Sequence, residues 1–178
     1  MDATLTWDPR MVDFSLLVTR LVFGALFAAH GCQKLFGWFG GAGPRATGEF
    51  FGSLGFHPGR AFSAIVGLTE LTGGLLILVG FLGPLGPALL LSVMTVAVVT
   101  VHWGNGLLAT SNGSELPLLY STAAISLALA GHGMYSLDAL LGISTFWSSS
   151  ITWAVLAVGV IGGLANVAAR RTATPRSA

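Results

Sequence analysis

The sequence predicts an all-α integral membrane protein, and three observations lead to this fold class. Hydrophobic residues make up 53% of the 178 residues, only 8% are charged, and the mean hydropathy is +0.80. Soluble domains carry about 25% charged residues, and a chain of this length cannot bury so much apolar surface in water. The apolar residues are also grouped into stretches of the length that a bilayer requires. Lipid is therefore expected to be the main solvent of this chain.

Five apolar stretches qualify as membrane-spanning helices, each of which needs about 20 mostly apolar residues. The expected spans are residues 13–34, 61–82, 86–103, 116–131 and 151–169. The fourth stretch is the shortest and the least clear of the five. The uncharged turn at residues 83–87, GPLGP, predicts that the second and third spans are antiparallel neighbours.

The longest connection, residues 35–60, contains a short amphipathic segment from Thr47 to Leu54. Phe50, Phe51 and Leu54 recur there at helical spacing beside polar residues. This pattern predicts a short helix that lies on the membrane surface and does not cross it.

The lysines and arginines predict the orientation of the chain. Six of the eight lie beside the 35–60 connection or in the C-terminal tail, which five spans place on one face: Lys34, Arg45, Arg60, Arg170, Arg171 and Arg176. Because cytoplasmic segments carry the excess of positive charge, we expect this face to be cytoplasmic and the N-terminus to lie outside.

Two charged residues lie well inside the expected spans, where a charge costs at least about 2.5 kcal/mol and normally has a partner. Arg20 lies a third of the way along the first span, and Glu70 lies in the middle of the second. At 1.5 Å of rise per residue both are expected near mid-depth, so we predict that Arg20 and Glu70 form an ion pair. Such a pair either fixes the helix register or also borders a path for a ligand or proton.

A second polar group is expected at the cytoplasmic ends of the spans. His30 and Lys34 are one helical turn apart, His102 and Asn105 follow the third span, and Glu115 opens the fourth. These residue types suit a quinone headgroup, whose carbonyl oxygens need donors and whose reduction needs protons. The alternative is a set of hydrogen-bonded helix-end residues. A bis-histidine haem is disfavoured because His102 lies near a helix end and the sequence has no haem-attachment motif.

Other features limit the function classes. Cys32 is the single cysteine, so the chain has no internal disulfide, no paired redox cysteines and no cysteine-based metal site. The basic residues form no run, which argues against binding of nucleic acid. Gly159 and Gly163 form a GxxxG pair that joins the fifth span either to the bundle or to a second copy of the chain. The absence of inverted repeats disfavours a transporter.

The chain resembles the DoxX family of small bacterial membrane proteins. The resemblance covers about residues 14–141 and depends on six segments in this order: LLVTRLVFGALFAAHGCQKLFGWFGG (16–41), GEFFGSLGF (48–56), GLTELTGGLLILVGFLGPLGP (67–87), VHWGNG (101–106), ELPLLY (115–120) and GHGMYSLD (131–138). It implies a four-helix transmembrane bundle as the core, with the span at 151–169 as an addition outside it. One membrane domain would then fill residues 1–178, with a basic tail at 170–178 and multi-pass insertion in the bacterial plasma membrane.

The resemblance also implies a set of recurrent polar residues, which largely coincides with the set selected by the cost of charge in lipid. Carried over by position, they are Arg20, His30, Gln33, Lys34, Glu70, His102, Asn105 and Glu115. We treat them as candidate ligand-binding residues, with no catalytic residue and no metal site assigned.

Family members are linked to redox chemistry: an archaeal thiosulfate:quinone oxidoreductase contains related subunits, and mycobacterial members look like scaffolds for oxidative-stress enzymes. Animal relatives look like assembly chaperones for membrane receptors. The resemblance therefore implies a redox-linked subunit or anchor that works with a partner oxidoreductase or a redox-stress enzyme, with a quinone as the candidate ligand. The alternative is a non-enzymatic scaffold or assembly factor, and the residues leave open whether the chain is itself an enzyme.

Overall fold

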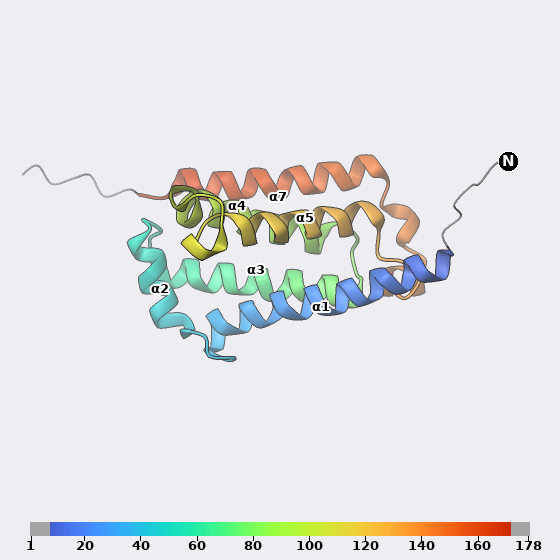
Figure 1. Ribbon diagram of the computed structural model, residues 1–178, viewed down its shortest axis with the longest axis horizontal. Helices are drawn as coiled ribbons and strands as arrows, with labels where there is room; N and C mark the ends of the chain where they lie inside the picture. The colour runs from blue at the N-terminus through green and yellow to red at the C-terminus, as the bar shows by residue number, and fades with distance from the viewer. Residues whose placement is uncertain (1–7, 172–178) are drawn as a thin grey trace, which may run out of the picture.

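The structure is a computed structural model that describes residues 8–171. These residues form helices and loops with no strand among them. Five helices lie side by side as a bundle: α1 (Pro9–Phe36), α3 (Gly59–Val79), α4 (Leu85–Ala97), α5 (Glu115–Ala130) and α7 (Ser149–Ala169) (Figure 1). Over residues 8–171, four helices are long and apolar enough to cross a membrane, and α5, with 16 residues, is shorter. The predicted all-α membrane fold is confirmed.

The two ends of the bundle carry different short elements. Helix α2 (Gly43–Ser53) lies across one end, where the sequence predicts a surface helix (Figure 1). The chain returns to this end after α7, where the Arg171 amide donates to the Gly55 carbonyl over 2.8 Å. The opposite end holds the start of α1, helix α6 (Leu137–Leu140) and the 3₁₀ turn η4 (Ser144–Phe146). All five bundle helices therefore run between the same two ends. Arg176 of the predicted basic tail lies outside the described residues.

Local sequence signals set where the helices begin and end. The Asp8 carboxylate accepts from the Arg10 amide at 2.9 Å and Pro9 follows as the first helical residue of α1. Both features are typical of helix starts because they satisfy or remove amides that have no partner within the helix. Helix α1 ends at Gly37, whose φ of +72° is a conformation that favours glycine.

Helix α4 continues without a break into a wider turn. Residues Val98–His102 form the π-helix η1, and Trp103–Asn105 form the 3₁₀ turn η2, so the whole segment Leu85–Asn105 spans 21 residues. Short π-helical turns are rare and occur often at functional sites because they redirect side chains. His102 is the last residue of this wide turn.

Glycines bring α1 and α3 into direct backbone contact. A Cβ atom added at Gly24 would lie 2.7 Å from the Gly74 carbonyl oxygen, and one at Gly31 would lie 2.6 Å from the Gly67 carbonyl oxygen. Small residues at such contacts let membrane helices approach closely, since lipid provides little hydrophobic force between them. These two contacts fix the register of the antiparallel α1–α3 pair.

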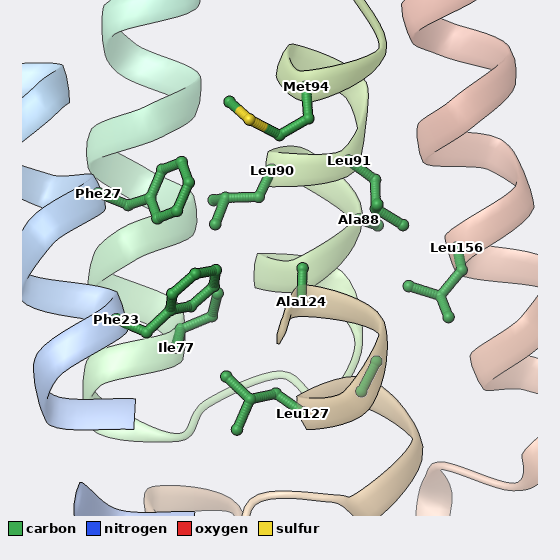
Figure 2. Packing of buried hydrophobic residues seen from close by; sticks show 11 residues of the cluster. Phe23, Phe27, Ile77, Ala88, Leu90, Leu91, Met94, Ala124, Leu127 and Leu156 are labelled. Atoms are coloured by element: carbon green, nitrogen blue, oxygen red, sulfur yellow. The ribbon is translucent and has the colours of Figure 1, made fainter. Parts of the chain in front are cut away.

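The apolar core lies between α1, α3, α4 and α5 (Figure 2). Phe23 and Phe27 of α1 point toward Ile77 of α3 and Leu90 of α4, and the Phe27 ring meets Tyr120 of α5 edge-on with centroids 5.3 Å apart. The outer faces of the helices carry many exposed apolar side chains. This distribution is expected for helices whose outer surfaces contact lipid.

Helix α7 packs on the outside of this core through its glycine pair. A Cβ atom at Gly159 would lie 3.0 Å from the carbonyl carbon of Ala88, and one at Gly163 would lie 2.7 Å from the carbonyl oxygen of Ser92. The GxxxG pair thus joins α7 to α4 within the same chain. Because α4 already covers both glycines, homo-oligomerisation through Gly159 and Gly163 gains no support from the fold.

Adjacent glycines of α7 offer a direct test of this packing. Gly163→Ala is expected to destabilise the protein by about 1–3 kcal/mol, because the added methyl group overpacks the contact with α4. Gly162→Ala serves as the control, since an added Cβ there meets only the Ser92 hydroxyl at 3.8 Å. Thermal denaturation in detergent should separate the two variants, and equal midpoints would contradict the observed face of α7.

Candidate functional site

A pocket of about 290 Å³ lies at the α2 end of the bundle. Its polar wall consists of Lys34 from α1, Glu70 from α3 and His102 from the π-helix η1. The rest of the lining is mostly apolar and comes from α2, α3, α4 and η1, namely Phe50, Phe51, Val66, Val93, Met94, Val96, Ala97, Thr100 and Val101. We call this the Lys34–Glu70 pocket. A small polar patch in an apolar concave site is typical of a small-molecule binding site.

The charged wall is a short ion pair between two helices. The Lys34 ammonium donates to the Glu70 carboxylate over 2.6 Å, and Glu70 is only 4% exposed. Lys34 lies in the last turn of α1, and a Cβ atom added at Gly67 would lie 3.2 Å from the Cβ of Lys34, so this glycine brings α3 close to the lysine. Glu70 lies one helical turn after Gly67, and its carboxylate therefore reaches the Lys34 ammonium.

His102 is the third polar residue that lines this pocket. Its Nδ1 lies 2.8 Å from the Asn112 carbonyl oxygen, which can only accept, so Nδ1 carries the proton. In the neutral ring Nε2 is then an acceptor, and in the protonated ring it is a donor. His102 can thus exchange a proton with a ligand in the pocket.

The remaining predicted residues of this end lie beside the pocket and do not line it. The His30 Nδ1 is 3.0 Å from the Gln33 Oε1, and the Gln33 amide donates to the Phe39 carbonyl at 3.2 Å. Asn105 donates to the Val101 carbonyl at 3.0 Å. Glu115 accepts from the Ala109 amide at 2.7 Å. These contacts hold the α1 exit and the 103–115 loop in place around the site.

Arg20 does not pair with Glu70, so the predicted Arg20–Glu70 ion pair is wrong. The α1–α3 register places Arg20 beside Gly80, whose Cα lies against the guanidinium, and Glu70 lies ten residues earlier in α3. Ten helical residues correspond to about 15 Å along the axis, beyond the reach of the side chain. The expectation that both residues lie near mid-depth is also wrong for Arg20, which lies level with the C-terminal end of α3, because the sequence alone does not give the register of the two helices.

Cysteine cross-linking tests this register. On a Cys32→Ser background, the pair Lys34→Cys and Gly67→Cys is expected to form a disulfide in membranes, because a Cβ atom at Gly67 would lie 3.2 Å from the Cβ of Lys34. The pair Arg20→Cys and Glu70→Cys should not form one. Gel mobility under oxidising and reducing conditions reads out both pairs, and a bond in the second pair alone would contradict the structure.

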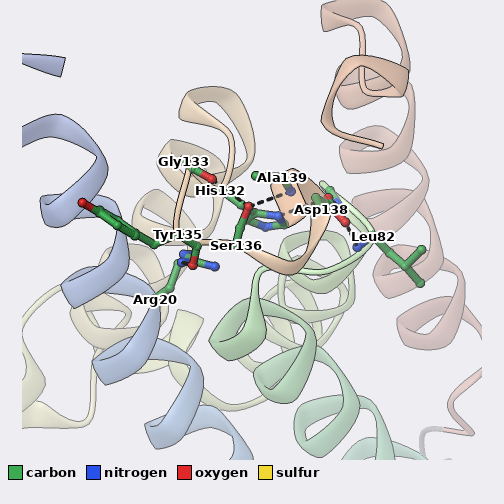
Figure 3. A network of polar contacts seen from close by, with 9 residues as sticks. Arg20, Leu82, His132, Gly133, Tyr135, Ser136, Asp138 and Ala139 are labelled. Atoms are coloured by element: carbon green, nitrogen blue, oxygen red, sulfur yellow. Dashed lines mark hydrogen bonds and ion pairs between the residues drawn. The ribbon is translucent and has the colours of Figure 1, made fainter. Parts of the chain in front are cut away.

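A second polar cluster lies at the opposite end of the bundle (Figure 3). The Asp138 carboxylate accepts from the Leu82 amide at 2.8 Å and from the Gly83 amide at 2.7 Å, and His132 Nδ1 is 3.4 Å from its Oδ2. Arg20 is fully buried and donates to the Tyr135 carbonyl over 2.7 Å. We call Arg20, His132 and Asp138 the Asp138 cluster. It holds the 131–140 segment against the α3–α4 turn.

His132 and Asp138 were missed as functional candidates because they follow the fourth span in what reads as a surface loop. Both residues lie in the segment GHGMYSLD, which contributed to the family resemblance. The resemblance assigned no chemical role to either of them. Nothing local indicates that this loop folds back onto the bundle and buries both side chains. Over residues 8–171, no three His, Cys, Asp or Glu side chains converge as a metal ion would require.

The buried histidine makes stability depend on pH. Burial lowers the pKa of His132 below its ordinary value of 6.5, while Asp138 opposes this shift and Arg20 adds to it. The folded state then binds this proton less readily than the unfolded state, so the free energy of unfolding falls as the pH drops below about 6.5. We expect His132→Gln to reduce the loss of thermal stability between about pH 7 and pH 5. An unchanged pH slope would contradict this.

Comparison with known proteins now places the chain in a family. A sequence model described as DoxX matches residues 15–103, which is half of the chain. The chain belongs to the DoxX family. No curated protein and no solved structure matches the chain.

The DoxX match runs from α1 to the start of η2 and therefore contains the whole polar wall of the Lys34–Glu70 pocket. Arg20, His30 and Gln33 also lie inside the matched region, whereas Asn105, Glu115, His132 and Asp138 lie beyond it. This DoxX protein is a multi-pass membrane protein in which helices α5 and α7 complete the bundle outside the matched segment.

Proposed function

We propose that this DoxX-family protein is a redox-linked subunit or anchor of the plasma membrane that binds a quinone headgroup in the Lys34–Glu70 pocket. The observation that carries the proposal is the buried ion pair in the wall of a mostly apolar pocket that His102 also lines. A cavity of about 290 Å³ accommodates an aromatic headgroup, while an isoprenoid tail would extend into lipid.

The chemistry of the three polar side chains fits the two forms of a quinone. Lys34 can donate to a quinone carbonyl oxygen, and Glu70 and His102 can each deliver or take one proton as quinone and quinol interconvert. The reaction also needs two electrons. The chain has one cysteine and hence no dithiol to supply them, so the electrons would come from a partner oxidoreductase.

A second candidate function is a scaffold or assembly factor without enzymatic activity. The observation that favours it is the Lys34–Glu70 ion pair itself, which joins α1 to α3 over 2.6 Å and so supports the bundle. Glu70→Gln distinguishes the two functions. Loss of folding in this variant supports a structural role, whereas a folded variant that loses quinone supports the binding site.

The test is purification of the protein from native membranes in mild detergent, followed by solvent extraction and chromatography of quinones. We expect bound quinone in the wild type and its loss in Lys34→Met, together with an oxidoreductase that co-purifies and is identified by mass spectrometry. Arg45→Met is the matched control, because Arg45 pairs only with the exposed Glu49 on α2. A wild-type protein without quinone and without a redox partner would overturn the proposal.

A further inference from the structure

Three arginines lie where α3 begins and α7 ends, at the end of the bundle that α2 crosses (Figure 1). Arg60 is the second residue of α3 and is exposed, Arg170 directly follows α7 and is half-buried, and Arg171 is exposed. We call these three residues the arginine patch. Among residues 8–171, none of the three forms an ion pair with an acidic side chain.

Backbone contacts hold the two helix ends of the patch together. The Arg171 amide donates to the Gly55 carbonyl over 2.8 Å, and the Gly55 amide donates to the Gly52 carbonyl over 3.0 Å. Gly52 also touches the start of α3, since a Cβ atom added at Gly59 would lie 2.8 Å from the Gly52 amide nitrogen. Three consecutive backbone contacts therefore join Arg171 to the residue before Arg60, which keeps the patch around the α2–α3 connection.

The positive charge of the patch is not neutralised by the acidic residues at this end of the bundle. Within the described part of the chain, each of these acidic side chains already has another partner: Glu49 pairs with Arg45, Glu70 pairs with Lys34, and Glu115 accepts from the Ala109 amide. A group of like charges without a counter-charge attracts a ligand of opposite sign. The ligand that complements the patch is therefore an anion.

The position of the patch indicates which anion this is. Arg60 lies in the first turn of one span and Arg170 directly follows another, so the patch lies where two spans leave the hydrocarbon core. Phospholipid phosphates lie at this depth, and basic sites between membrane helices bind anionic headgroups. All three cations are arginines, whose planar guanidinium groups can bond phosphate oxygens in pairs. An acidic protein surface would have to displace these headgroups first.

We propose that the arginine patch binds the phosphate of an anionic phospholipid. The acyl chains of this lipid would lie along the outer face of α7, where Ile161 and Leu164 are exposed. This site goes beyond the quinone proposal and does not depend on it, because the patch shares no residue with the Lys34–Glu70 pocket.

Titration of the full chain in detergent with single lipids, read out by native mass spectrometry, tests the site. Dioleoyl phosphatidylglycerol is expected to bind at least about tenfold more tightly than dioleoyl phosphatidylcholine, which has the same acyl chains and no net charge. Arg60→Gln and Arg171→Gln should each weaken phosphatidylglycerol by about fivefold, the change that corresponds to about 1 kcal/mol per arginine at an anionic surface.

Matched variants separate the patch from general effects of charge and folding. Arg10→Gln removes an exposed arginine at the opposite end of the bundle, near Asp8 and Asp13, and should leave the lipid preference unchanged. The double variant Arg60→Lys with Arg171→Lys keeps both charges and should retain most of the preference. The backbone bond from Arg171 to Gly55 is present in every variant, since it does not involve the side chain.

Three results would overturn the proposal. Equal affinity of the wild type for the two lipids would show that the patch does not select an anionic lipid and would leave it to an acidic protein surface. An unchanged preference in the double variant Arg60→Gln with Arg171→Gln would place the selective site elsewhere. Displacement of phosphatidylglycerol by an equal concentration of glycerol 3-phosphate would assign the patch to a soluble phosphate ester.

Discussion

Replacing Asp138 with alanine is expected to destabilise the protein by about 3–5 kcal/mol, the cost of removing one partner from a buried charged network. Asp138 is 2% exposed and accepts from the amides of Leu82 and Gly83, which have no other acceptor at hand in the α3–α4 turn. The same change removes the carboxylate beside His132 and the negative charge that acts on the buried Arg20. The expected result is a large fall of the thermal midpoint in detergent.

One further variant and a control show whether the charge or the hydrogen bonds of Asp138 make the larger contribution to stability. Asp138→Asn keeps an oxygen for the turn amides but removes the charge, so we expect an intermediate loss of stability. Asp13→Ala is the matched control, because Asp13 accepts only one exposed amide, that of Met134 at 2.9 Å, and should cost about 1 kcal/mol. An Asp138→Ala protein as stable as Asp13→Ala would contradict the buried network.

Reversing one charge of the Lys34–Glu70 pair is expected to have the second large effect. Glu70→Lys places two ammonium groups where the native atoms are 2.6 Å apart, in a site that is largely shielded from water. We expect a loss of more than about 3 kcal/mol or failure to insert, because like charges repel strongly at low dielectric. The double reversal Lys34→Glu with Glu70→Lys should recover much of this loss.

The exposed pair Arg45–Glu49 serves as the comparison for this cycle. Its side chains are 80% and 70% exposed, and its atoms are 3.3 Å apart. Exposed pairs contribute about 0–1 kcal/mol, so a single reversal at Glu49 should change stability little. Thermal denaturation of the wild type and of the two single reversals and the double reversal of each pair, seven proteins in all, gives the two coupling energies. Equal coupling in the two pairs would show that burial does not strengthen the Lys34–Glu70 interaction.

The fold was largely predictable because the membrane requires long apolar helices. The stretch 61–82 is observed as Gly59–Val79, and 151–169 is observed as Ser149–Ala169. Asp8, Pro9 and Gly37 account for the bounds of α1. The expected span 13–34 did not include the polar first turn of this helix, which begins at Pro9. The π-helical turn at Val98–His102 has no such signal, since it depends on how α4 packs against its neighbours.

The candidate site was predictable only in part. The cost of charge in lipid marked Arg20 and Glu70, and Lys34 was grouped with the polar residues at the helix ends, but the partner of each charge depends on the glycine contacts between α1 and α3. Those contacts set Arg20 beside the α3–α4 turn and Glu70 beside Lys34. His132 and Asp138 required knowledge of a loop that folds back on the bundle, and no periodic pattern encodes such a return.

The most direct test of the quinone pocket is binding of a quinone without a tail to the purified protein. Equilibrium dialysis of menadione against nanodiscs is expected to give saturable binding at one site per chain in the wild type and in Arg45→Met. Lys34→Met and His102→Gln should weaken this binding by at least about tenfold, because each removes a polar side chain that the proposed site uses to bond the headgroup. Menadione binding that is unsaturable, or equal in the wild type and both pocket variants, would contradict a quinone site between Lys34, Glu70 and His102.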